Sequence, residues 1–155
     1  MIPIYLEMKA FGPYAGQEIV DFRELGDHKL FLIYGPTGSG KTTILDAMCY
    51  ALYGSTSGDS RTGAHMRSEY ASPQEATAVS FRFAIGRKYY RIDRSPEQEI
   101  TKKRGPGLKK AAAHAALYET DEDGAQEQLV AAKNVTAAVV GLLGFKAGQF
   151  RQVVL

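Results

Sequence analysis

The sequence predicts one α/β domain built on a mixed α+β sheet, and three observations favour this fold class. Several short segments alternate polar and apolar side chains, as half-buried strands do. A glycine-rich segment at residues 35–40 stands between an apolar run and an amphipathic helical pattern. The 155 residues, of which 45% are hydrophobic and 23% charged, suffice for one globular core but not for two ordinary domains.

Three strands are predicted before the glycine-rich segment. Alternation predicts strands over residues 2–9 and 17–22, and the turn-forming residues 11–14 separate them. Residues 28–34 form the third predicted strand, after a short polar connection. Its central run at residues 30–33 is apolar on both faces, which indicates a buried strand in the middle of a sheet.

A helix is predicted over residues 41–53, directly after the glycine-rich segment. Its apolar residues recur at helical spacing and predict one buried stripe, formed by Ile44, Leu45, Met48, Ala51 and Leu52. A Gly/Ser/Thr-rich loop follows at residues 54–63. Residues 75–85 and 87–94 alternate on either side of Gly86 and predict a β-hairpin.

The last third of the chain mixes loops with two predicted elements. Residues 95–110 show no periodicity and contain several prolines and glycines, which predicts an exposed loop. A returning strand is predicted at residues 111–119 and an acidic turn at residues 120–125. The final predicted helix covers residues 134–143 and ends at Gly144, because glycine readily adopts the backbone conformation that stops a helix.

The net charge of +2 is unevenly distributed along the chain. Residues 87–110 contain nine basic and three acidic residues, which give this stretch a charge of +6. The basic residues are Arg87, Lys88, Arg91, Arg94, Lys102, Lys103, Arg104, Lys109 and Lys110. A local basic excess predicts a surface that faces an anion, with nucleic acid as the first candidate and a merely solvated face as the alternative.

The cellular compartment is predicted from cysteine content and hydropathy. Cys49 is the only cysteine, so no internal disulfide can form. No apolar run reaches the roughly 18 residues that suggest a membrane span. The chain begins with strand-like residues and shows no charged leader with a cleavage site. We therefore expect a cytoplasmic protein that makes no membrane contact.

The glycine-rich segment carries the phosphate-binding motif G-x-x-x-x-G-K-[ST], the P-loop. Backbone N–H groups of such a loop surround phosphates, and the helix that follows adds the positive end of its dipole. We therefore expect ATP and Mg²⁺ as cofactors. The residues expected to bind the nucleotide are Gly35, Pro36, Thr37, Gly38, Ser39, Gly40, Lys41, Thr42 and Thr43.

Two of these residues have predicted chemical roles. Lys41 is the candidate catalytic residue, since this lysine reaches the β- and γ-phosphates, and the Thr42 hydroxyl is the candidate Mg²⁺ ligand. A complete P-loop enzyme also needs an acidic residue at the end of a second apolar strand. No run of four apolar residues after the motif ends in Asp or Glu, and the nearest candidate, Asp93, follows a segment interrupted by Arg91. We therefore expect this acidic centre to be missing from the chain.

The residues around the motif resemble the SbcC family, the SMC-like ATPase subunits of bacterial SbcCD nucleases. The similarity covers the strand that ends at residues 21–22, the P-loop and the helix that continues to Ala-Leu-Tyr-Gly at residues 51–54. It extends to residues 69–73, 91–99 and 150–155. The resemblance therefore runs nearly from end to end.

The resemblance implies that residues 1–155 form the N-terminal ATP-binding lobe of an ABC-type P-loop NTPase half-head, with an antiparallel β-subdomain. In that family a coiled coil separates this lobe from a C-terminal lobe with the remaining catalytic motifs. The chain is accordingly expected to end before the Q-loop glutamine. Gln152 is not that glutamine. The full-length protein would hydrolyse ATP, whereas this chain alone would be inactive.

The resemblance also implies partners and a biological role. The expected partners are the C-terminal lobe of the same protein, a second ATPase head that encloses ATP in a homodimer, the nuclease subunit SbcD, and DNA. The implied role is regulation of DNA end processing during double-strand-break repair, in the bacterial cytoplasm near the nucleoid.

Two other functions fit the motif. A small P-loop kinase or transferase is one, although such enzymes usually place the P-loop after the first strand, and two strand-like segments precede it here. A DNA-binding module that does not hydrolyse its nucleotide is the other. Salt-dependent DNA binding without hydrolysis, even by the full-length protein, would favour the second alternative.

Overall fold

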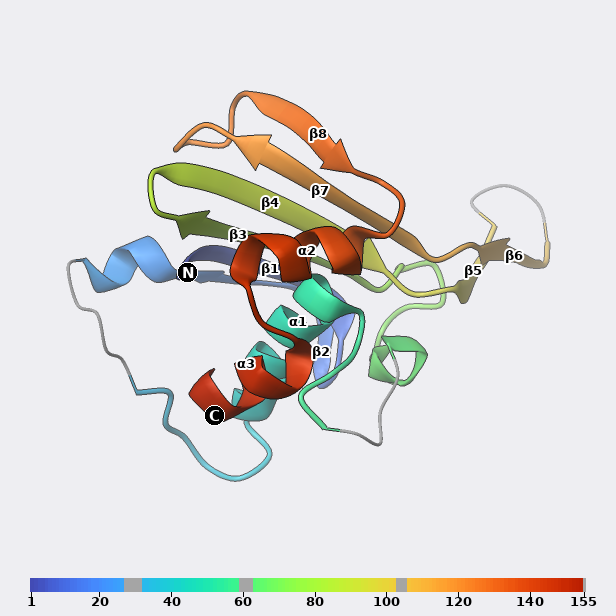
Figure 1. Ribbon diagram of the computed structural model, residues 1–155. Helices are drawn as coiled ribbons and strands as arrows, with labels where there is room; N and C mark the ends of the chain where they lie inside the picture. The colour runs from blue at the N-terminus through green and yellow to red at the C-terminus, as the bar shows by residue number, and fades with distance from the viewer. Residues whose placement is uncertain (27–31, 59–62, 103–105, 155) are drawn as a thin grey trace.

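The computed structural model describes residues 1–26, 32–58, 63–102 and 106–154. One six-stranded antiparallel sheet forms a layer against which the helices pack (Figure 1). Its strands are β1 (Ile2–Phe11), β2 (Tyr14–Asp21), β3 (Ala78–Ile85), β4 (Lys88–Ser95), β7 (His114–Thr120) and β8 (Glu127–Ala131). The order across the sheet is β2-β1-β3-β4-β7-β8, so the first strand of the chain lies inside the sheet rather than at its edge.

Three helices and a small ribbon complete the fold. The helices are α1 (Lys41–Tyr53), α2 (Val135–Leu143) and α3 (Ala147–Val154), with short 3-10 turns η1 (Phe22–Leu25) and η2 (Gly63–Met66). β5 (Gln98–Thr101) and β6 (Leu108–Ala111) pair with each other as a two-stranded ribbon that projects from the end of the main sheet (Figure 1).

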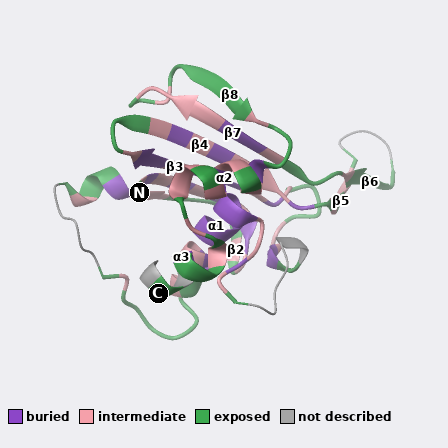
Figure 2. Cartoon of the chain, in the orientation of Figure 1, coloured by how far each residue is buried: buried purple, intermediate pink, exposed green. Residues whose placement is uncertain are grey.

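The core lies between the sheet and α1. Alternate residues of the central strands face this helix and are almost fully buried, among them Leu6, Met8, Phe81, Phe83 and Ile92. The rings of Phe81 and Phe83 stack with 5.5 Å between their centroids. Figure 2 shows the buried residues gathered on α1 and the central strands, whereas β8 at the sheet edge is exposed.

The predicted bounds of the P-loop helix are confirmed, but the prediction of a single buried stripe is wrong. Every residue of α1 from Asp46 to Tyr53 is buried. The reason is that α1 contacts β1, β3 and β4 on one side and α2 and α3 on the other. A helix enclosed by other elements on several sides buries its whole circumference. Ile44 and Leu45, at the start of the helix, are only half-buried.

Most other predicted elements are confirmed with small shifts of their bounds. The first two predicted strands are β1 and β2, the predicted hairpin is β3–β4, and the returning strand is β7. The final predicted helix is α2, and Gly144 ends it with a φ of 77°. The structure adds β8, α3 and the short turns η1 and η2, which the sequence did not indicate, as well as the ribbon strands β5 and β6.

Two predictions fail. Residues 95–110 are not merely a loop, because β5 and β6 form there. Of the predicted strand at 28–34, residues 28–31 lie outside the described part of the chain, and residues 32–34 are not in a strand. Leu32 and Tyr34 are 84% and 86% exposed, so the prediction of a buried central strand is wrong for them. A buried strand needs a neighbour on each edge, and the described sheet ends at β2 and β8 without including this segment.

None of the helices in the described ranges is both long and apolar enough to cross a membrane.

Candidate nucleotide-binding site

The predicted phosphate loop lies on the surface immediately before α1. Residues Gly35 to Ser39 are exposed, and Gly40 is half-buried where the loop enters the helix. Gly38 and Gly40 both have a φ of +86°, in the left-handed region that side chains with a Cβ rarely adopt. The two glycines therefore allow a loop shape that other residues at these positions would strain.

Lys41 folds back over the loop that precedes it. Its Nζ donates hydrogen bonds to the carbonyl oxygens of Gly35 and Pro36, at 2.8 Å each. The ammonium group thus lies within the curve of the loop, on the exposed side of the molecule. Carbonyl oxygens attract the ammonium as phosphate oxygens would, but without a full negative charge. A phosphate group could therefore take over these contacts.

The positive end of the α1 dipole, at the helix N-terminus, is met by no capping side chain and by no acidic residue of the first turn. Gly40 is the N-cap residue and provides no side-chain hydrogen bond, and the first turn contains no acidic residue. The first N–H groups of a helix lack partners within the helix and carry a partial positive charge, so they bind anions. Thr42, in this first turn, is exposed. Its hydroxyl is therefore accessible to a metal ion at the loop.

Thr43 is the one predicted site residue whose side chain is buried. Its N–H donates to the carbonyl oxygen of Gly40 at 3.0 Å, and its side chain packs against Gly12 in the β1–β2 turn. Tyr14, at the start of β2, reaches the same region, with 3.4 Å between its hydroxyl and the carbonyl oxygen of Gly40. Burial raises the pKa of Tyr14, which keeps this hydroxyl protonated and able to donate.

Sequence reasoning missed this role of the β1–β2 turn. The turn-forming residues predict a connection between two strands, and the resemblance to SbcC implies that Gly12, Pro13 and Tyr14 stand where that family often carries a basic residue near the nucleotide. Neither inference assigned the turn a packing role. The signal that could have indicated more is Gly12, since a glycine with positive φ is needed where backbone and helix approach closely.

Sequence reasoning also missed Asp46, a buried carboxylate in α1. Its Oδ1 accepts hydrogen bonds from the backbone N–H of Ser57, at 2.8 Å, and from the Ser57 hydroxyl. A carboxylate in an otherwise apolar helix segment was the available signal, because buried charges are rarely left without partners. Asp46 fixes the loop that leaves α1 and so supports the helix that carries the P-loop.

Asp93, the nearest candidate for the missing acidic centre, points away from α1. Its neighbours Ile92 and Tyr90 on β4 are buried toward the helices, so Asp93 lies on the opposite face of the sheet. There its carboxylate accepts hydrogen bonds from Ser80, at 2.6 Å, and from Arg91, at 3.1 Å. Within the described ranges, His, Cys, Asp and Glu side chains form no group of three that could hold a metal ion.

The basic stretch is divided by the fold into separate surfaces. Lys88 pairs with Glu119 at 3.0 Å, Lys110 pairs with Glu97 at 2.9 Å, and Arg91 pairs with Asp93 at 3.0 Å and also with Glu127. Arg94 is half-buried and binds backbone carbonyl groups instead.

Besides the half-buried Arg94, the basic residues of the stretch that have no acidic partner in the described chain are Arg87, Lys102 and Lys109. Lys103 and Arg104 lie outside the described residues. In the described chain, two of these residues, Lys102 and Lys109, lie at the β5–β6 ribbon, and Arg87 lies in the β3–β4 turn.

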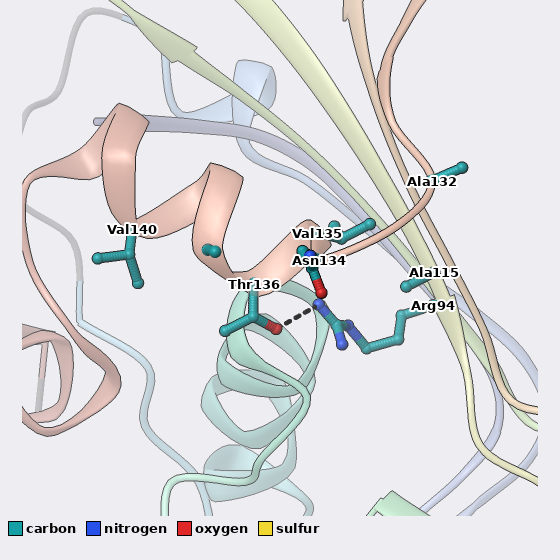
Figure 3. A pocket seen from close by; sticks show the side chains of 8 residues that line it. Arg94, Ala115, Ala132, Asn134, Val135, Thr136 and Val140 are labelled. Carbon is teal, nitrogen blue, oxygen red and sulfur yellow. Dashed lines mark hydrogen bonds between the residues drawn. The ribbon is translucent and has the colours of Figure 1, made fainter.

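A cavity of about 680 Å³ lies elsewhere, between α2 and the ends of β4 and β7 (Figure 3). Its lining is mainly small apolar side chains, with Arg94 as its charged group. The Arg94 guanidinium is already bonded to Thr136 and to carbonyl oxygens of α1. The P-loop, with its exposed N–H groups and lysine, remains the candidate nucleotide site.

The chain is similar to known proteins over most or all of its length. The sequence pattern that defines the AAA domain matches residues 5–144. The chain belongs to the AAA domain family. This AAA domain is similar over its whole length to proteins named as the C subunit of the nuclease SbcCD, with 50% identity to that of Vibrio cholerae and 46% to that of Lactococcus lactis. The Staphylococcus aureus proteins of the same name are 34% identical over 99% of the chain.

The AAA domain spans only 15% of the length of these relatives. The resemblance to SbcC that the motifs indicated is confirmed, and so is the mixed α/β fold with an antiparallel sheet. The matched segment has the fold that it shares with the relatives. The activity of the complete relatives is a property of chains several times longer.

Proposed function

We propose that this AAA domain is the ATP-binding N-terminal lobe of an SMC-like ATPase that regulates DNA end processing in double-strand-break repair. The observation that carries the proposal is the position of the Lys41 ammonium, 2.8 Å from two carbonyl oxygens of an exposed glycine loop at a helix N-terminus. The similarity to SbcC proteins over the whole chain supports the biological part of the proposal.

The residues of the loop fit a triphosphate. Residues 35–43 would bind it through the backbone N–H groups of the loop and of the first turn of α1, while Lys41 neutralises charge on the β- and γ-phosphates. The exposed Thr42 hydroxyl would hold Mg²⁺, which supplies further charge neutralisation when bound. Gly38 and Gly40 keep the loop backbone free of side chains, so that phosphates can approach closely.

The described structure supports a half-site rather than a complete ATPase. The candidate acid Asp93 is engaged on the opposite sheet face. Leu32 and Tyr34, directly before the loop, expose apolar surface that a neighbouring strand could cover. We assign this cover to the C-terminal lobe of the same protein, which would also complete an ABC-type head. A second head would enclose ATP, and hydrolysis would take place in that assembly.

The remaining partners follow from the relatives and from charge. The relatives are named as subunits of a nuclease, so a nuclease subunit of the SbcD type is the proposed protein partner. DNA is the proposed anionic partner, with the β5–β6 ribbon as its contact surface, since Lys102 and Lys109 lack acidic partners in the described chain. With these partners, the proposed location of the protein is the bacterial cytoplasm, near the nucleoid.

The test is calorimetric titration of the chain with MgATP. The chain should bind MgATP weakly, and Lys41→Ala should remove the binding, because Lys41 provides the only side-chain charge within the loop. Lys133→Ala is the matched control, since this lysine is equally a single exposed charge but lies just before α2. Equal affinity of the wild-type and Lys41→Ala chains would refute the nucleotide site.

A further inference from the structure

The β1–β2 turn contacts the junction between the P-loop and α1 at two residues, Gly40 and Thr43. Gly12 has a φ of +59°, and a Cβ placed on it would lie 2.7 Å from Cγ2 of Thr43. Real Cβ atoms essentially never approach so closely. The backbone of Gly12 therefore lies directly on the third residue of the helix and leaves no space between them.

Tyr14 fills the space beside Gly40. A Cβ placed on Gly40 would lie 2.3 Å from the Tyr14 hydroxyl oxygen and 2.8 Å from its Cζ. The hydrogen bond from this hydroxyl to the Gly40 carbonyl is long, at 3.4 Å, so it contributes little. The ring of Tyr14 acts mainly by occupying space. A side chain at position 40 would clash with this ring.

The turn itself is held from behind and cannot yield easily. The Gly12 N–H donates to the carbonyl oxygen of Met66 at 2.7 Å. The carbonyl oxygen of Ala10 accepts from the N–H of Ser68 at 2.9 Å and from the hydroxyl of the fully buried Thr77 at 3.0 Å. A turn with such anchors is stiffer than the exposed loop that it contacts.

We propose that Gly12 and Tyr14 are positioning residues of the nucleotide site: the β1–β2 turn acts as a rigid support that fixes the exit of the P-loop in its phosphate-binding shape. This inference rests on the proposed function. The support acts on Gly40 and Thr43, whose neighbours Lys41 and Thr42 carry the proposed phosphate and Mg²⁺ contacts. A shift of the β1–β2 turn by a few tenths of an ångström would therefore displace both Lys41 and Thr42.

The first experiment compares Gly12→Ala with Gly86→Ala. Gly86 has almost the same φ, +60°, but a Cβ there would meet nothing within 4 Å. Both variants carry the same backbone strain, whereas only Gly12→Ala pushes on Thr43. We expect Gly12→Ala to raise the MgATP Kd about tenfold, which is about 1.4 kcal/mol at 25 °C, and Gly86→Ala to raise it less than about twofold.

The second experiment tests the contact itself by rescue. Thr43→Ser removes Cγ2, the atom that the new Cβ meets at 2.7 Å. In the Gly12→Ala background, Thr43→Ser should restore affinity to within about twofold of Thr43→Ser alone. A simple loss of stability would not be rescued in this way, because Thr43→Ser adds no stabilising contact. Melting temperatures of all variants show whether each is folded.

The third experiment uses Tyr14 and stays informative if Gly12→Ala does not fold. Tyr14→Ala empties the space beside Gly40, and we expect about a tenfold loss of MgATP affinity. Tyr14→Phe keeps the ring and should bind within about twofold of the wild type. An equal loss in both variants would overturn the argument that the ring supports the loop.

The outcomes separate this inference from the proposed function. If the wild-type chain does not bind MgATP, or if Lys41→Ala binds it equally well, the proposed function fails. If Lys41→Ala abolishes binding while Gly12→Ala matches Gly86→Ala and Tyr14→Ala matches the wild type, the nucleotide site stands and the support is refuted.

Discussion

The Nε of Arg94 on β4 donates a hydrogen bond to the carbonyl oxygen of Ala51 in α1, with 2.9 Å between the two atoms. The last carbonyl groups of a helix have no partners within the helix and carry a partial negative charge. The same guanidinium reaches the carbonyl of Leu52 at 3.4 Å. It also reaches the hydroxyl of Thr136 in α2 at 3.2 Å (Figure 3). Arg94 therefore joins the sheet, the far end of the P-loop helix and α2.

Replacement of Arg94 by Met should destabilise the fold. The change keeps much of the apolar stem but leaves the carbonyl groups of Ala51 and Leu52 without their charged donor. Loss of a hydrogen bond to a partly buried charged group gives an expected decrease in the free energy of unfolding of about 2 kcal/mol. Urea denaturation of the two chains measures this difference.

Arg87→Met is the control for Arg94→Met. Arg87 is exposed in the β3–β4 turn, so its replacement should change the free energy of unfolding by less than about 0.5 kcal/mol. Equal effects of the two substitutions would show that the contacts of Arg94 do not stabilise the helix.

The chain alone should hydrolyse ATP at a negligible rate. In phosphoryl transfer the protein contributes mainly positioning and charge. The acid that holds Mg²⁺, the Q-loop glutamine and the motif of a partner head are all expected to lie outside this chain. A phosphate-release assay at saturating MgATP checks the expectation, with Lys41→Ala as the background control. Turnover of about 1 s⁻¹ would contradict it, and loss of that turnover in Asp93→Asn would identify Asp93 as an overlooked second acidic centre.

Stability should decrease at alkaline pH because of two tyrosines in α1. Burial raises the pKa of Tyr50 and of Tyr53 from 10.0 to about 12. Below pH 10 both are neutral in the folded and unfolded chains, and their contribution to stability is fully present. As the pH rises from 10 to about 12, the unfolded chain loses these protons first, so the contribution is lost.

Melting temperatures measured between pH 8 and about 12 test this expectation, because the fall should steepen above the ordinary tyrosine pKa of about 10. The double variant Tyr50→Phe and Tyr53→Phe should have a shallower fall than the wild type. Tyr70→Phe, at a side chain that is 79% exposed, is the matched control. An unchanged pH dependence in the double variant would show that other groups are responsible.

The β5–β6 ribbon should contribute to DNA affinity in the complete head. Each phosphate neutralised by a basic residue releases counterions, so the logarithm of affinity falls with the logarithm of salt by about 0.9 per contact on duplex DNA. Replacement of Lys102, Lys103 and Arg104 by Ala should weaken binding to all sequences similarly and flatten the salt slope by roughly two to three units. Binding measured over a range of salt concentrations gives both quantities.

Lys88→Ala provides the comparison for the ribbon variant. Its ammonium already pairs with Glu119 at 3.0 Å on the main sheet, so its removal should leave the salt slope unchanged. If the ribbon variant has the wild-type slope, its charges are a solvated face, which is the alternative that the sequence left open.

Periodicity made the strands and helices with long, regular patterns predictable. α1 has the predicted bounds because a glycine motif marks its start and Gly54 its end. The β5–β6 ribbon has strands of four residues, too short for alternation to be recognised. It depends instead on tertiary contacts, since the Gln98 side chain exchanges hydrogen bonds of 2.7 and 2.9 Å with the backbone of Thr77.

The motif predicted the segment that forms the phosphate loop, but not what supports it. The contact between Tyr14 and Gly40 joins residues 26 positions apart, and Asp46 and Ser57 are 11 apart. Such contacts arise only when separate elements pack together, and no local pattern encodes them. Leu32 illustrates a different limit of sequence-based prediction. An apolar run predicts a buried strand, but it does not show which neighbouring element covers that strand.

The tie between Arg94 and α1 has a consequence for synthesis of the protein on the ribosome. Lys41 leaves the ribosome after β1 and β2 but before β3 and β4, so a nascent chain first presents a helix whose buried residues are only partly covered by the sheet. At ordinary rates of translation, about 3 to 10 s pass before Arg94 follows. During this interval the apolar residues of the nascent P-loop helix are partly exposed to water, and the helix reaches its native packing only after β3 and β4 have been translated.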